Sequence, residues 1–129
     1  MPQKKGMIVL MGSGELASTM VEVHKGLLAG LGPSPKAVFL DTPAGFQLNA
    51  DEISQKAVRY FRDRVHHPLA VASLKSAQDF ATDPGRAALA LMCDADYLFM
   101  GPGSPSYAVD QWQQTPIPAV FIQRVAAGA

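Results

Sequence analysis

The apolar run Met7-Ile8-Val9-Leu10-Met11 is followed at once by Gly12-Ser13-Gly14. The run has no polar alternation, which is typical of a parallel strand buried on both faces. From Leu16 to Leu31 apolar side chains recur at helical spacing, and Gly32-Pro33 ends that segment. A strand, a glycine turn and a helix in this order predict the first unit of an α/β sheet.

The same alternation continues along the chain. Three more strands are expected, at residues 36–41, 69–74 and 96–100. Helices are expected between and after them, at residues 50–65, 83–92, 107–113 and 119–127. Right-handed crossovers then favour a three-layer, doubly wound parallel sheet in the strand order 3-2-1-4, with helices on both faces. We expect a single α/β domain over residues 1–129, incomplete at its C-terminus and truncated before a fifth strand.

Composition excludes several classes of protein. The 129 residues include 11 Lys or Arg and 11 Asp or Glu, so the formal net charge is zero. This balance argues against a nucleic-acid partner and against a polybasic membrane patch. No stretch approaches the roughly 18 apolar residues that cross a membrane. A lone cysteine, Cys93, excludes an intrachain disulfide and a cysteine-only zinc site, and it favours a reducing, cytoplasmic location.

The predicted topology brings two glycine loops together. Ligands of doubly wound sheets bind beyond the carboxyl ends of the strands, where the strand order reverses. The loops after the first and last strands lie there, and the turn after the second strand would border the same pocket. The predicted oxyanion or ligand loops comprise Gly12, Ser13, Gly14, Glu15, Gly101, Gly103 and Ser104, and the pocket border comprises Asp41, Thr42 and Pro43.

Three interpretations of Gly12–Ala17 stay open. The segment matches G-x-G-x-x-A between a strand and a helix, the context of a dinucleotide fingerprint, and Asp41 stands where a ribose-binding acid would follow. Glu15, however, places a negative charge where the pyrophosphate would lie. The segment is therefore a structural turn, an oxyanion or substrate loop, or the phosphate loop of a small Rossmann-like module for a nucleotide or acidic ligand. In the other loop, Gly101 and Gly103 can present backbone amides to a developing oxyanion, and Ser104 can cap the next helix.

No residue of this sequence is assigned a catalytic role. The serines near the predicted cleft lie outside any G-x-S-x-G elbow. His24 is expected on a solvated helix face, and His66 and His67 at the opposite end of the sheet from the cleft. Cys93 is expected in the core. No carboxylate stands at ligand spacing from a histidine, so neither a metal nor another cofactor is expected.

Three stretches together resemble a known family: Met11–Glu15, Leu40–Gln47 and Phe99–Tyr107. In order and spacing they resemble the N-terminal part of class I glutamine amidotransferase-like proteins, in the branch of cyanophycinase and dipeptidase E serine hydrolases. The resemblance implies a flavodoxin-like sandwich, with a Ser or Cys nucleophile on an elbow after the next strand and a catalytic His further downstream. It also implies that Gly101 and Gly103 belong to the loop that contributes an oxyanion-hole N–H.

The resemblance has limits that shape the expected function. The sequence stops at Ala129, before the strand that would carry the elbow, so it implies a hydrolase-like scaffold that is inactive by itself. Peptidases of the family often have Gly-Gly-x-Gln where this chain has Gly101-Pro102-Gly103-Ser104, which counts against peptidase activity. A small-molecule or peptide-like ligand is the expected partner. Self-association is expected through residues 97–100, which would form an uncovered sheet edge.

Overall fold

A three-stranded parallel sheet forms the centre of the molecule in the computed structural model, which describes residues 5–12 and 14–129. Its strands are β1 (Ala37–Leu40), β2 (Ala70–Ala72) and β3 (Tyr97–Met100), in the order β2-β1-β3. Phe39 lies opposite Val71 on one side and Phe99 on the other. The expected α/β class and parallel sheet are confirmed, and so are the predicted strands at 36–41, 69–74 and 96–100.

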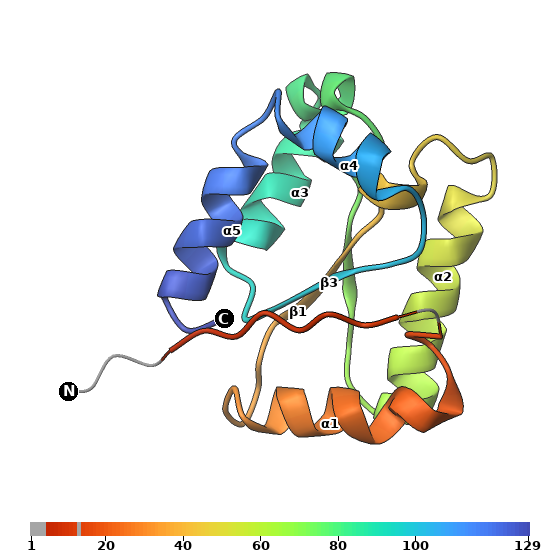
Figure 1. The fold of residues 1–129 in the computed structure, drawn as a ribbon, viewed down its shortest axis with the longest axis vertical. Coiled ribbons are helices and arrows are strands. Elements are labelled where there is room, and N and C mark those ends of the chain that lie inside the picture. The colour runs from red at the N-terminus through yellow and green to blue at the C-terminus, as the bar shows by residue number, and fades with distance from the viewer. Residues whose placement is uncertain (1–4, 13) are drawn as a thin grey trace.

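Helices cover both faces of this sheet (Figure 1). They are α1 (Val21–Ala29), α2 (Ala50–Tyr60), α3 (Asp83–Cys93), α4 (Pro105–Trp112) and α5 (Ile117–Ala126). Short 3₁₀ turns occur at Ser18–Met20, Thr42–Ala44 and Ala77–Ala81, and α2 continues into a π turn at Phe61–Val65. None of the helices described is long and apolar enough to cross a membrane.

The two faces of β1 supply two separate cores. Phe39 packs with α1 and α2 in a cluster that also contains Leu28, Phe61 and Phe99. Val38 and Leu40 point the other way and pack with Met92 and Val120 of α3 and α5. Successive side chains of a strand point to opposite faces, so a strand covered on both sides reads as a continuous apolar run. This is why the strand pattern was readable without polar alternation.

The expected first strand and the order 3-2-1-4 are not what the structure has. Residues 6–12 belong to no helix or strand, and β1 pairs directly with β3 from Ala37–Tyr97 to Leu40–Met100. The second and fourth predicted strands therefore pair directly, and no strand lies between them. The apolar run is consequently left outside the sheet, with Met7 67%, Ile8 75% and Leu10 93% exposed.

A second correction concerns the burial of Cys93. Cys93 was expected in the core but is exposed. The buried positions of α3 are Gly85, Ala88 and Met92, which follow the helical repeat, and Cys93 is the last residue of the helix, one position beyond that inward face. Ser104, in contrast, caps α4 as expected, because its hydroxyl accepts from the amide of Tyr107 at 3.1 Å.

Candidate functional site

The loop after β3 packs tightly on the turn after β1. The amide of Ser104 donates to the carbonyl of Pro43 at 2.8 Å. Gly103 has φ 148°, and a Cβ there would collide with the same carbonyl, so the close approach needs glycine. Gly101 is similarly pressed against the ring of Phe39. The turn that contains Thr42 and Pro43 thus lies against the Gly101–Ser104 loop.

The first glycine loop reaches the same end of the sheet. A cavity of about 390 Å³ is lined by Gly14, Glu15, Leu16, Ala17, Ile53, Lys56 and Pro102. The residues after the predicted first strand and the loop after β3 therefore share one hollow. A Cβ added at Gly12 would meet nothing within 4 Å, and Ser13 lies outside the described residues. Lys56 and Glu15 bring opposite charges to this cavity, which suits a small ligand with an anionic group better than a polyphosphate.

His24 holds the first loop in place, and its position corrects the sequence-based expectation. Its side chain is 0% exposed rather than solvated. The buried positions of α1 are Val21, His24 and Leu28, which follow the helical repeat and place His24 on the inward face. Its Nε2 lies 2.8 Å from the carbonyl oxygen of Glu15, and its Nδ1 lies 2.8 Å from the hydroxyl of Tyr97.

The partners of His24 fix its tautomer. A carbonyl oxygen only accepts hydrogen bonds, so Nε2 must carry the proton. In the neutral ring Nδ1 then accepts from the Tyr97 hydroxyl. Burial raises the pKa of Tyr97 to about 12, with the nearby Tyr60 adding to the shift, so this hydroxyl keeps its proton at neutral pH. The cavity wall at Glu15 is thereby tied to β3 through two hydrogen bonds.

This raised pKa predicts a loss of stability in alkali. An unfolded tyrosine ionises near pH 10, whereas folded Tyr97 does so at about 12. Above about pH 10 the unfolded state therefore binds fewer protons than the folded state, and stability falls as pH rises toward 12. We expect Tyr97 to account for about 2 kcal/mol of that fall. Urea titrations across this range should show a shallower pH dependence for Tyr97→Phe. Parallel curves for the two proteins would contradict the burial of this hydroxyl.

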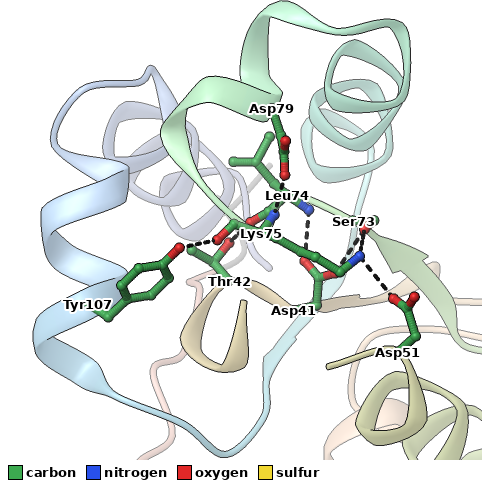
Figure 2. Close-up of polar contacts among 8 residues, drawn as sticks. All are labelled: Asp41, Thr42, Asp51, Ser73, Leu74, Lys75, Asp79 and Tyr107. Carbon is green, nitrogen blue, oxygen red and sulfur yellow. Dashed lines mark hydrogen bonds and ion pairs between the residues drawn. The ribbon is translucent and has the colours of Figure 1, made fainter. Parts of the chain in front are cut away.

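A buried carboxylate organises the turns after β1 and β2. Asp41 is 3% exposed; its oxygens accept from the Leu74 amide at 2.7 Å and from the Ser73 hydroxyl at 2.8 Å, and Lys75 Nζ lies 3.5 Å away (Figure 2). Its neighbour Thr42 donates its hydroxyl to the Leu74 carbonyl at 2.5 Å. Both carboxylate oxygens of Asp41 therefore accept hydrogen bonds from its own chain, and neither is directed toward a ribose.

Lys75 completes this network from the other strand end. Its ammonium lies 2.9 Å from Asp51, in the first turn of α2, and 3.1 Å from the hydroxyl of Ser73. The hydrogen bond with Asp51, aided by the charge of Asp41, raises the pKa of Lys75. Lys75 is therefore a permanent cation at neutral pH and cannot serve as a base for Ser73. The backbone carbonyl of Lys75 accepts a hydrogen bond from the Tyr107 hydroxyl at 2.7 Å (Figure 2).

Sequence reasoning missed Ser73, Lys75, Asp51 and Tyr107. A signal was present, because Asp41 and Ser73 lie at the carboxyl ends of two predicted strands, 36–41 and 69–74, and the carboxyl ends of neighbouring parallel strands meet at one edge. What the sequence lacks is any local sign that the Asp41 carboxylate points toward β2 rather than toward the ligand pocket.

Catalytic and metal-binding chemistry is sparse in the described part of the chain. His24 contacts Tyr97 and Glu15, and His67 contacts the carbonyl of Pro68 at 2.8 Å, so neither ring bonds a serine hydroxyl. His67 lines a larger groove of about 870 Å³ at the amino ends of the strands, away from the glycine loops. Within residues 5–12 and 14–129, no group of three or more His, Cys, Asp and Glu side chains could hold a metal ion.

Comparison with known proteins adds nothing to this geometry: the chain matches no family model, no curated protein and no solved structure. The fold and the position of the loops define an α/β protein with a parallel sheet and a cavity at the carboxyl ends of its strands. Any assignment of function therefore rests on the site itself.

Proposed function

We propose that this chain is a class I glutamine amidotransferase-like, serine-hydrolase-like domain that supplies a ligand-binding wall and an oxyanion loop, but neither nucleophile nor general base. The observation that carries the proposal is the shared cavity, which joins Gly14–Ala17 to Pro102 at the carboxyl ends of the parallel strands. This is where sheets of this class bind ligands. Gly101 and Gly103 flank Pro102 in this loop and supply its free amides, because the Ser104 amide donates to the Pro43 carbonyl.

The hydroxyls of two serines at this end of the sheet already make hydrogen bonds within the fold, which supports an inactive scaffold. The hydroxyl of Ser104 caps α4, and the hydroxyl of Ser73 lies between the Asp41 carboxylate and the Lys75 ammonium. A serine nucleophile needs a base within about 2.6–3.2 Å. A cationic Lys75 offers no free electron pair, and the Asp41 oxygens already accept from the Ser73 hydroxyl and the Leu74 amide.

A second candidate is a small binding module for a nucleotide or acidic ligand. Lys56 of α2 favours it, because this basic residue lines the same cavity as Gly14–Ala17. The negative charge of Glu15 in the same wall favours a ligand with a single carboxylate or phosphate over a dinucleotide. The two candidate functions therefore use the same cavity and differ in the class of ligand that would bind there and stabilise the protein.

Thermal melting with candidate ligands tests both. A ligand at a hundredfold excess over its Kd adds about 2.7 kcal/mol to the stability. We expect acidic amino acids or dipeptides to raise the Tm by several degrees, and Lys56→Gln to remove the rise. Arg59→Gln, on the exposed side of the same helix, is the matched control and should keep it. A rise with nucleotides alone would favour the binding module, and no rise with any of these ligands would contradict both candidates.

Activity measurements address the catalytic half of the proposal. The purified chain should not accelerate the hydrolysis of an activated ester or a dipeptide above the buffer rate. Turnover that disappears in Ser104→Ala would make the loop serine a nucleophile and overturn the assignment.

Several sequence-based expectations stay predictions within this proposal. A central fourth strand in the order 3-2-1-4 would require the ladder between β1 and β3 to open for residues 7–11. Self-association through β3, which requires that no segment of the same chain occupies that edge, would appear as a Tm that rises with protein concentration. A cytoplasmic location fits the single cysteine of the sequence.

A further inference from the structure

The sheet has an open edge on β3. Among the described residues, β3 has one strand neighbour, β1, and its other edge pairs with no strand. The same molecule carries an apolar segment that is out of the sheet, because Met7, Ile8, Val9 and Leu10 are 67%, 75%, 42% and 93% exposed. An open edge and an unpaired, strand-forming segment are complementary surfaces.

The two ends of this segment lie at the two ends of β3. Its beginning is held at the C-terminus, where the Met7 amide donates to the Ala129 carbonyl at 2.9 Å. The same C-terminal helix reaches the start of β3, since Arg124 Nε donates to the Ala95 carbonyl at 2.8 Å. At the other end, Gly14 lines one cavity with Pro102, just beyond β3. Residues 7–11 therefore run in the same direction as β3, and Figure 1 shows this first segment crossing from the C-terminus toward α2.

The side-chain pattern fits a particular register. Aligning Gly14 with Pro102 places Met11 beside Phe99 and Leu10 beside Leu98. Paired residues of parallel strands point to the same face of the sheet. Met11 already packs against the core cluster that contains Phe99, whereas Leu98 packs against the cluster of the other face. A docked Leu10 would join Leu98 there and lose its exposure.

We propose that Met7–Met11 docks on the open edge of β3 as a fourth parallel strand of the same chain. The segment is tied at both ends, so its effective concentration at the edge exceeds that of a second copy in dilute solution. Docking would also hold Gly14 and Glu15 where they line the cavity with Pro102, beyond the carboxyl end of β3. The inference goes beyond the proposed function, because it gives the sheet edge a defined occupant whatever ligand the cavity takes.

A pair of matched substitutions tests the docking. Leu10 and Leu48 are 93% and 108% exposed in the structure, so an undocked chain should tolerate aspartate equally at both. If Leu10 is buried against Leu98, Leu10→Asp should lower the Tm by roughly 5 °C or more while Leu48→Asp changes it little. Equal effects of the two substitutions would overturn the proposal.

Cross-linking identifies the strand's partner. In a Cys93→Ser background, Leu10→Cys with Leu98→Cys should give an intrachain disulfide on mild oxidation, because neighbouring strands bring paired Cβ atoms close to disulfide range. Leu10→Cys with Val71→Cys, on the opposite edge strand β2, is the control and should not cross-link. A disulfide-linked dimer that increases with concentration would assign the edge to a second copy. That result, or no cross-link in the folded protein, would overturn the proposal.

Discussion

His24→Ala is expected to lower the free energy of unfolding by about 4 kcal/mol, a large share of the roughly 5–15 kcal/mol of an ordinary domain. The ring is fully buried, with its centroid 5.0 Å from that of Phe61 and 5.3 Å from that of Phe99. Its removal leaves a cavity, for which buried truncations cost about 2–5 kcal/mol. It also leaves the Tyr97 hydroxyl and the Glu15 carbonyl without their partner, at about 1–3 kcal/mol for each group that water does not reach.

Urea unfolding of the variant measures this loss. His66→Gly is a suitable control, because His66 is exposed and adopts a left-handed conformation (φ 61°) that glycine accepts readily. The control should change stability by less than about 0.5 kcal/mol or increase it slightly. A loss below about 1 kcal/mol in His24→Ala would mean that the ring does not tie the loop to β3.

The position of His24 shows which part of the fold the sequence could not specify. His24 stands four residues before Leu28, so the helical repeat places both side chains on one face of α1. The structure buries that face, whereas Val23 is 41% exposed. The apolar pattern predicts that a helix forms, but a histidine at the border of its apolar face carries no local sign of burial, because its partner Tyr97 is distant in the sequence.

The strands likewise show that a local apolar pattern predicts a strand but not its pairing partner. The runs that became β1 and β3 were readable because each is apolar on both faces. Met7–Met11 has the same composition, so local pattern alone could not distinguish a paired strand from an exposed segment. Strand pairing depends on which backbone groups meet in the folded chain. Because β1 pairs directly with β3, residues 7–11 cannot lie between these two strands as predicted.

The candidate site was predictable to the extent that topology fixed it. Thr42, Pro43 and the Gly101–Ser104 loop follow strands that are adjacent in the structure, and the two turns are in contact. The network of Asp41 with Ser73 and Lys75 was not predicted, because its members are far apart in sequence and each has an ordinary local role. Only the register between β1 and β2 brings them together.

Asp41→Ala is expected to lower the free energy of unfolding by about 3 kcal/mol. Removing one partner of a buried ion pair costs about 3–5 kcal/mol when the other charge stays buried. Lys75 is only partly buried, with 34% of its side chain exposed, and it keeps Asp51 at 2.9 Å, so its share of the loss is smaller. The buried amide of Leu74, however, loses its acceptor at 2.7 Å and cannot reach water.

Two asparagine substitutions separate the charge from the hydrogen bonds. Asp41→Asn keeps one oxygen as acceptor for Leu74 and should lose about half as much stability as Asp41→Ala. Asp51→Asn removes a carboxylate that is 83% exposed from the same lysine and should cost less than about 1 kcal/mol. Because Asp41 fixes the turn beyond β2 on which Tyr107 of α4 rests, proteolysis should also reach residues 73–79 sooner in Asp41→Ala than in Asp51→Asn. Equal stability losses in Asp41→Ala and Asp51→Asn would show that ion pairing, and not the buried amide, holds the two strand ends together.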